Sequence, residues 1–143
     1  MKDVVIAIHS RNDLDGEEDV IDFVTDGLYT FDGEVACLTY LESEVTGMEG
    51  TRTSVMVLPD KVVVDRDGAV MSRMVFQEGQ RSSFLYDTPY GAATMHLETR
   101  GIRSSFDGDG GKMKIDYVLD LEHAMVSRNL FQLTVTRQKP LAQ

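Results

Sequence analysis

Arginine and tyrosine side chains are the groups in this sequence best suited to recognise a ligand. A guanidinium matches the geometry of a carboxylate or a phosphate, and a phenol adds one donor or acceptor. We predict that these side chains, with one asparagine, bind a small anionic or amphipathic molecule. The predicted ligand-binding residues are Arg52, Arg73, Tyr86, Tyr90, Tyr117, Arg128 and Asn129. A purely structural polar network is the alternative explanation for the same residues.

Metal-binding side chains are too scattered to predict a metal site. A zinc site needs three or four ligands around one point, and only His96 and Glu98 lie two residues apart on one strand face. A solvated strand face explains that pair better. A calcium-binding loop that began at Asp107 would have Lys112 in place of the required glycine at position 6 and Val118 in place of the glutamate at position 12. The remaining residues of metal-ligand type are His9, Cys37 and His123.

Catalytic motifs are equally weak. No Gly-x-Ser-x-Gly segment is present, and Cys37 lies among strand residues, where a lone cysteine is usually a small core residue. Asp87 and Thr88 are followed by Pro89, where an aspartic protease requires glycine. We therefore predict no catalytic residue, no metal and no cofactor, and an enzyme is the least favoured of the functions considered.

The charge of the chain restricts its partners. The sequence has 143 residues, with 24 acidic and 14 basic side chains and a net charge of −10. Such a surface repels nucleic acid and anionic membranes. The N-terminus is too polar for a secretory signal, no apolar run is long enough to cross a membrane, and a single cysteine cannot form an internal disulfide. These features predict a cytoplasmic protein.

Strand-like alternation of apolar and polar residues runs through most of the chain, which is typical of half-buried antiparallel strands. Residues on one face of the segment 112–122 are Met113, Ile115, Tyr117, Leu119 and Leu121. Residues on one face of the segment 125–137 include Phe131, Leu133 and Val135. In the segment 33–43 the corresponding set is Val35, Cys37, Thr39 and Leu41.

Turn signals divide these runs into about ten strands. Asp-Gly, the dipeptide that suits tight hairpins, occurs at 15–16, 26–27, 32–33, 67–68, 107–108 and 109–110. Glu78-Gly79 and Pro59-Asp60 add two further turns, and the segment 42–50 is the best candidate for a short helix or lid. Consecutive short hairpins leave two open edges unless the sheet closes. We therefore predict one domain, residues 1–143, that forms a closed up-and-down antiparallel β-barrel; a Greek-key sandwich is the competing architecture.

The predicted turns also fix two strand registers. A turn at Glu78-Gly79 would place Arg73 opposite Phe84 and Met71 opposite Tyr86, so Arg73 would lie near Tyr86 in the barrel. A three-residue loop at 122–124 would pair Tyr117 with Asn129 on the buried face. The segment Tyr86–Gly91 contains proline and glycine at positions that suit a stiff corner between two strands.

Four segments, in this order, resemble the YwiB-like family of small bacterial proteins of unknown function. They are residues 50–57, 71–91, 113–122 and 126–135, and the run Tyr86–Gly91 is the most distinctive. The resemblance implies a calycin-type, lipocalin-like β-barrel. Barrels of this type often hold a ligand with an interior arginine and an interior tyrosine.

Two functions follow from this reasoning. The first is binding of a small anionic or amphipathic molecule inside the barrel. The second is a protein–protein interaction or dimerising module whose barrel is filled by side chains. The sequence is compatible with a monomer or a homodimer, and it identifies neither the ligand nor the process.

Overall fold

A computed structural model of the chain describes residues 2–121 and 125–138, which form ten antiparallel strands and one short 3-10 helix. The strands are β1 (Lys2–Leu14), β2 (Glu17–Phe31), β3 (Ala36–Leu41), β4 (Thr51–Val57), β5 (Val62–Gly68), β6 (Ser72–Phe76), β7 (Arg81–Thr88), β8 (Gly91–Asp107), β9 (Gly110–Leu121) and β10 (Met125–Arg137). The helix η1 (Glu44–Thr46) lies in the segment predicted to hold one. No helix within the described ranges is long and apolar enough to cross a membrane.

Each strand except β6 pairs with the next along the chain, and the first and last strands pair with each other. The ladder between β1 and β10 runs from Val4 opposite Arg137 to Leu14 opposite Ser127. The sheet order begins at β6 and ends at β7, so the seam of the barrel lies between these two strands. Met71 and Asp87 bridge the seam with backbone hydrogen bonds of 2.8 and 2.9 Å. The result is the predicted ten-stranded barrel, nearly closed.

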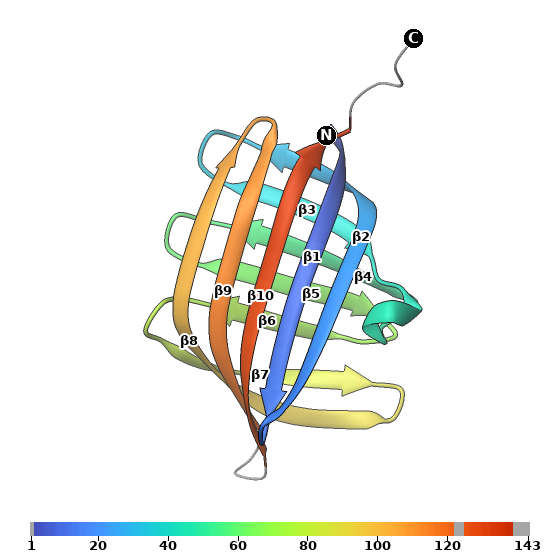
Figure 1. The fold of residues 1–143 in the computed structure, drawn as a ribbon, viewed down its shortest axis with the longest axis vertical. Coiled ribbons are helices and arrows are strands. Elements are labelled where there is room, and N and C mark those ends of the chain that lie inside the picture. Colours follow the sequence, from blue (N-terminus) through green and yellow to red (C-terminus); the bar gives the residue numbers. More distant parts are fainter. Residues whose placement is uncertain (1, 122–124, 139–143) are drawn as a thin grey trace.

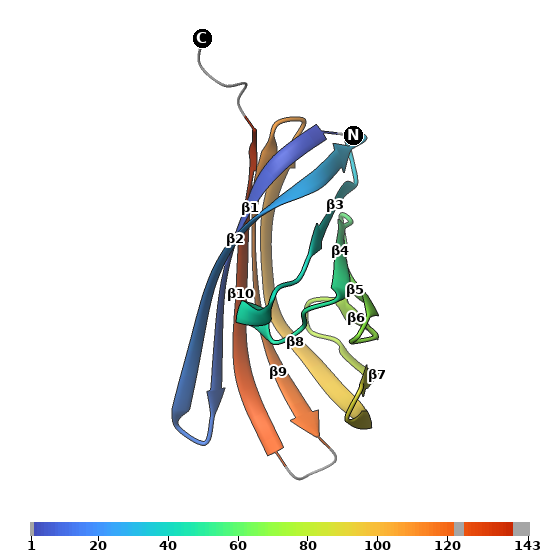
Figure 2. The ribbon, with the colours of Figure 1, turned by 90° about the vertical axis from the view of Figure 1, so that its right-hand side faces the viewer.

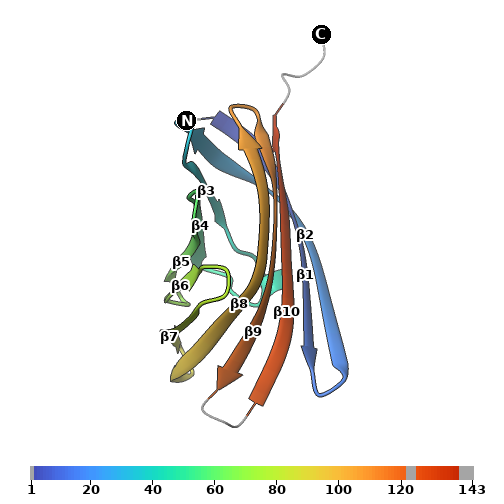
Figure 3. The ribbon, with the colours of Figure 1, turned by 90° about the vertical axis from the view of Figure 1, so that its left-hand side faces the viewer.

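The barrel is flattened into two layers. In Figure 1 the long strands β8, β9, β10, β1 and β2 run roughly vertically, and the shorter strands β3–β6 cross behind them. Figures 2 and 3 show the two layers edge-on, with β7 next to the lower part of β8. β8 curves between the layers, and its ladder with β9 contains a register shift between Thr99 and Gly101. Such a bulge bends a strand and lets one strand serve both layers.

The core lies between the layers and is built from alternate residues of every strand. In β9, Met113 and Ile115 are buried, and their neighbours Lys112 and Lys114 are exposed. The fully buried apolar or aromatic side chains with the largest volumes are Tyr29, Ile6, Leu38, Leu97, Ile115 and Leu133. Alternation therefore does what the sequence predicts in strands such as β9, where one face is packed and the other is solvated.

The structure corrects two details of the predicted strands: the buried face of β3 and the register between β6 and β7. In β3 the buried residues are Ala36, Leu38 and Tyr40, so Cys37 lies on the outer side of the barrel. Both faces of this segment carry apolar residues, and the alternation alone does not identify the inner one. The bridge at the seam pairs Met71 with Asp87 and not with Tyr86, which shifts the predicted register by one residue.

Most predicted turns are confirmed, with two exceptions. Asp67-Gly68 forms the end of β5, where both residues pair with β4. Asp26-Gly27 lies inside β2, where Gly27 pairs with Val4 and with Tyr40. A Cβ atom on Gly27 would stand 2.4 Å from Ile6 Cδ1 and 2.7 Å from the Thr39 carbonyl oxygen. This glycine is required for close approach of neighbouring groups and not for a turn. The register of the last hairpin is as predicted, with Tyr117 opposite Asn129; its loop, 122–124, lies outside the described residues.

Candidate functional site

The structure separates the predicted ligand-binding residues into two groups. Tyr86 and Tyr117 pack against the core, and Asn129 is buried. The four others are exposed: Arg52, Arg73, Tyr90 and Arg128. The interior therefore receives tyrosine and asparagine side chains from the predicted set, but none of its arginines.

The prediction that Arg73 lies inside the barrel is wrong. Its side chain is 67% exposed and binds the Asp65 carboxylate of β5 at 3.0 Å. The inward residues of β6 are Ser72, Met74 and Phe76, so Arg73 alternates outward. The one-residue error in the seam register removes the predicted proximity to Tyr86.

The other exposed residues have similar explanations. Arg52 alternates with the buried Thr51 and Thr53 and so points away from the core. Arg128 lines a hollow of about 380 Å³ on the outside of the barrel, where acidic and basic side chains are mixed. Tyr90 is 99% exposed at the tip of a turn.

Arg66 of β5 is the arginine that the fold turns inward. It follows the buried Val62 and Val64 at the strand's two-residue period, and Thr53 and Ser72 lie opposite it on the neighbouring strands. Its Nη1 donates to the Met74 sulfur at 3.5 Å, and its Nε is buried without a partner. Within residues 2–121 and 125–138, no carboxylate lies within ion-pair distance of this guanidinium.

Hydroxyl groups from both layers surround this part of the interior. Ser72 and Thr99 are buried and their oxygen atoms have no hydrogen-bond partner. The positive charge of Arg66 also acts on the phenols of Tyr40 and Tyr117. We call these five residues the interior polar cluster: Tyr40, Arg66, Ser72, Thr99 and Tyr117.

Strand register explains why these residues meet. On one layer, adjacent pairs run from Tyr40 to Thr53, from Thr53 to Arg66 and from Arg66 to Ser72. On the other, Thr99 is opposite Tyr117, which is opposite Asn129. Each layer therefore carries one row of polar side chains across otherwise apolar strands, and both rows point inward.

Tyr117 connects the cluster to the core. Its ring meets that of Phe76 edge-on, with 4.9 Å between the ring centroids. Burial raises the pKa of the Tyr117 phenol, and the positive charge of Arg66 opposes that rise. The pKa of Tyr40 is also raised, mainly by burial and then by the Glu42 carboxylate. Both phenols are therefore neutral hydrogen-bonding groups at physiological pH.

Glu42 supplies a negative charge beside the cluster. Its side chain is 7% exposed, and its carboxylate accepts hydrogen bonds from Thr46 at 2.7 Å and from Thr53 at 2.8 Å. Thr46 belongs to η1, so this contact fixes the helix against the barrel. Glu42 thus has two hydrogen-bond donors of its own, whereas Arg66 is left with a thioether.

Asn129 has a complete set of partners. Its Oδ1 accepts from Asn12 of β1 at 2.5 Å, and its Nδ2 donates to the carbonyl and hydroxyl oxygens of Ser127 at 3.2 and 3.0 Å. A satisfied network of this kind ties β10 to β1. Asn129 therefore fits the structural alternative better than it fits a ligand contact.

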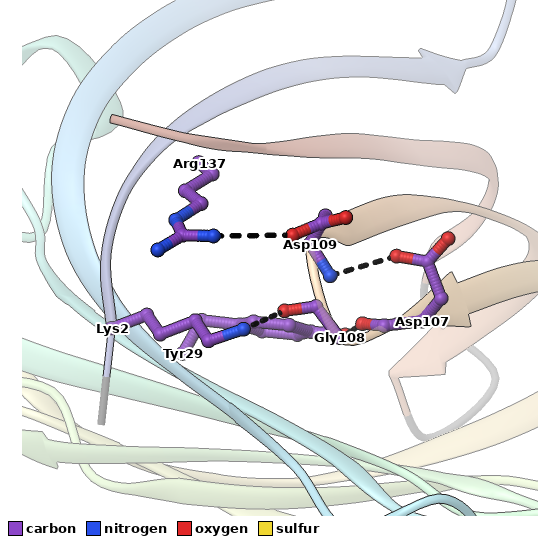
Figure 4. Close-up of polar contacts among 6 residues, drawn as sticks. All are labelled: Lys2, Tyr29, Asp107, Gly108, Asp109 and Arg137. Atoms are coloured by element: carbon purple, nitrogen blue, oxygen red, sulfur yellow. Dashed lines mark hydrogen bonds and ion pairs between the residues drawn. The ribbon is translucent and has the colours of Figure 1, made fainter. Parts of the chain in front are cut away.

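The turn between β8 and β9 lies at one end of the barrel and contacts side chains of three other strands (Figure 4). The Tyr29 hydroxyl donates to the Asp107 carbonyl oxygen at 2.7 Å, and Lys2 Nζ donates to the Gly108 carbonyl oxygen at 2.5 Å. Arg137 pairs with Asp109 at 3.4 Å. Strands β1, β2 and β10 are thereby connected to one turn.

The distinctive segment Tyr86–Gly91 is the predicted corner. Thr88 Oγ1 accepts from the Tyr90 amide at 3.2 Å and donates to the Gly91 carbonyl oxygen at 2.9 Å. These contacts order the turn between β7 and β8. Tyr86 is the member of the segment that packs on the core.

Within the part of the chain that the structure describes, no three or more histidine, cysteine, aspartate or glutamate side chains lie close enough together to bind a metal ion. His9 contacts Asp22 and His96 contacts Ser83, each as a separate surface pair. His123 lies outside the described residues.

The sequence contained a signal for Arg66 that was missed. Asp65 and Asp67 flank it, and two acidic neighbours on the solvated face place the residue between them on the inner face. The run Val62–Val64 is buried throughout and hides that phase. Glu42 follows the last residue of β3, where no alternation continues to reveal it.

Comparison with known proteins agrees with the fold. A family model described as "Domain of unknown function (DUF1934)" matches residues 6–133. The chain is 29% identical over 133 residues to the uncharacterised β-barrel protein YwiB of Bacillus subtilis (strain 168), covering 92% of this chain and 91% of that protein. The crystal structure of YwiB from Bacillus subtilis matches with a TM-score of 0.86 and 24% identity, covering 96% of this chain and 93% of that one.

Proposed function

The chain belongs to the DUF1934 family, and because this family has no known function we propose one from the geometry of the interior. The protein binds a small amphipathic anion inside the barrel, with the anionic group on Arg66. Tyr117 and Tyr86 contact the same ligand from β9 and β7. The apolar part of the ligand lies against the core side chains near the cluster.

The observation that carries the proposal is the unpaired state of Arg66. Arg66 is partly buried, with its Nε shielded from solvent. A guanidinium in such a place without a carboxylate is costly, because a thioether is a weak acceptor for a full positive charge. Two buried hydroxyls, Ser72 and Thr99, also have no partner. An anionic ligand would satisfy all three groups at once. This convergence favours a binding site over a structural network.

The seam supplies the route to this site. β6 and β7 are joined by the bridge between Met71 and Asp87 and by a hydrogen bond of 3.2 Å from the Ser82 hydroxyl to the Val75 carbonyl oxygen. Ser72, a member of the cluster, lies on β6 next to this seam. Few hydrogen bonds would have to open for a ligand to enter.

The test compares decanoate with decanol, which have the same chain length but differ in charge. We expect decanoate to bind, and to bind about tenfold or more weakly to an Arg66→Met variant, which removes the cation but keeps a long side chain. Arg73→Met is the matched control, since Arg73 lies outside and its variant should bind decanoate normally. Isothermal titration calorimetry measures each affinity. Equal binding of decanoate to both variants would reject Arg66 as the anion site.

Native mass spectrometry of the protein purified from its own host addresses the ligand itself. A co-purifying small anion that is lost from Arg66→Met supports the proposal. A protein partner found in its place supports the second candidate function.

That second candidate is an interaction module, which the outer side of β2 favours. Val20, Val24 and Leu28 are exposed at intervals of four residues along this strand. Asp22 and Asp26 lie between them on the same face, and exposed apolar residues grouped on one strand face can mark a contact surface. Sedimentation velocity of the protein and of a Val20→Ser/Val24→Ser variant tests self-association, and an unchanged monomer in both would remove a homodimer through this strand.

A further inference from the structure

A separate hollow lies on the outside of the barrel, over β8, β9, β10, β1 and β2. Its volume is about 490 Å³, which is within the range of small-molecule sites. Ala7, Ser105 and Thr134 are small residues in its lining and leave space between longer neighbours. The hollow is on the opposite side of the sheet from the core and does not include the interior polar cluster.

Three cations gather at one side of this hollow: Arg103, Lys112 and Lys114. Arg103 lies directly opposite Lys114 on the neighbouring strand. Lys112 is two residues from Lys114 on the same face, about 7 Å along the strand. Like charges placed directly opposite each other destabilise a sheet. The chain as a whole has a net charge of −10, so this group of cations is a local positive patch on a negatively charged protein.

Neighbouring carboxylates do not neutralise these cations. Among the residues that the structure describes, none of the three takes part in an ion pair or a side-chain hydrogen bond with an acidic residue. Asp22 lies at the far side of the hollow, where its carboxylate is 2.7 Å from His9 Nδ1. Asp116 is the next outward residue of β9 and lines the neighbouring hollow. The three cations therefore keep a net positive charge.

The opposite side of the hollow carries one exposed apolar side chain next to the pair formed by His9 and Asp22. Val24 is 68% exposed and lies opposite Ala7 of β1. The strands beneath the hollow are hydrogen-bonded to neighbours, β8 to both β7 and β9 for example, so they offer no free edge for an added peptide strand. Recognition has to come from side chains, with charge at one end and apolar contact at the other.

We propose that this outer hollow binds a small molecule that carries a phosphate group. The phosphate lies among Arg103, Lys112 and Lys114, and the apolar body of the molecule lies against Val24. A phosphate matches three cations better than a carboxylate does, because it has up to two negative charges and three oxygen acceptors. Binding also relieves the repulsion between Arg103 and Lys114.

The experiment is an NMR titration of the amide signals with phenyl phosphate and with inorganic phosphate at constant ionic strength. We expect shifts on the outer strands β8, β9, β10 and β1, with phenyl phosphate binding more tightly than inorganic phosphate. A Lys112→Gln/Lys114→Gln variant should bind both probes about tenfold more weakly. A Val24→Ser variant should lose only the advantage of phenyl phosphate. The control Lys61→Gln/Arg81→Gln removes the same charge elsewhere and should bind normally.

Several results would overturn the proposal. They are an absence of shifts with both probes, shifts confined to other strands, and equal binding by the double lysine variant and its control. Loss of phosphate binding in Arg66→Met would assign the effect to the interior and would also reject the outer site. Both lysines are exposed and Lys114 opposes a like charge, so the double variant should fold; a thermal denaturation curve tests whether it does.

Discussion

The Arg66 guanidinium donates a hydrogen bond of 3.5 Å to the Met74 sulfur, on the strand next to it. A thioether carries no charge and accepts weakly. Arg66 is partly buried, and a cation that is shielded from water without an anionic partner is destabilising. The contact with Met74 therefore compensates the charge of Arg66 poorly, and an apolar side chain at this position would be more stable.

Arg66→Met should therefore be as stable as the natural protein in the absence of ligand, or more stable by about 1–2 kcal/mol. The reason is that methionine fills similar space without a partly buried charge. Urea denaturation measures the free energy of unfolding. Arg73→Met, which removes an exposed pair worth roughly 0–1 kcal/mol, is the reference. A loss of several kcal/mol in Arg66→Met alone would show that the arginine is a structural element.

Glu42→Gln should destabilise the protein by about 1–3 kcal/mol, because the amide cannot accept on both sides as the carboxylate does. Thr46 and Thr53 each donate to a different oxygen of Glu42, and an amide nitrogen at one of these positions would face a donor. Glu44→Gln, at an exposed residue of η1, is the matched control and should change little. Hydrogen exchange of the η1 amides reports whether the helix is released as well.

The sequence predicts the framework better than the site because the two depend on different information. Alternation over long strands such as β9 fixes which side chains are buried, and the last hairpin register follows from loop length. The seam between β6 and β7 lacks such a ladder, so turn geometry alone placed Arg73 on the wrong side. One residue of register moves every side chain to the other face.

The inward orientation of Arg66 is also difficult to predict from the sequence. Its inward orientation follows from its phase relative to Asp65 and Asp67, but arginine in a strand is ordinarily solvated. The valine run before it is buried on both faces and removes the contrast that alternation requires. Only the assembled barrel shows that Thr99 and Tyr117, far away in sequence, share the same interior.

Tyr29→Phe should lower stability by about 1–3 kcal/mol, because the Asp107 carbonyl at the end of β8 loses its donor. The substitution should also alter the response to alkaline pH. Burial, with a smaller effect of Asp107, raises the pKa of Tyr29 from 10.0 to about 12. The folded protein holds this proton more tightly than the unfolded chain, so its contribution is complete below pH 10 and is lost as the pH rises to about 12.

The measurement is the free energy of unfolding of both proteins from pH 8 to about 12. The natural protein should lose stability more steeply than Tyr29→Phe above pH 10, where the unfolded chain releases the Tyr29 proton first. Tyr40 and Tyr117 also have raised pKa values and contribute equally to both proteins. Parallel curves would mean that the Tyr29 hydroxyl is not buried in solution.

Gly27→Ala tests whether this Asp-Gly pair is a close-packed strand position. The added Cβ would meet the Thr39 carbonyl oxygen at 2.7 Å as well as the flexible end of Ile6. The Ile6 side chain can rotate, but the Thr39 carbonyl belongs to the paired strand β3 and cannot move without breaking the ladder. We expect a loss of about 2–3 kcal/mol in the free energy of unfolding, as for other overpacked interiors.

Gly101→Ala is the control, because the nearest atom to its added Cβ is Glu78 Oε1 at 3.8 Å. Equal stability of the two variants would mean that β2 and β3 separate enough to accept the methyl group, and the tight packing beside Tyr40 would have to be reconsidered.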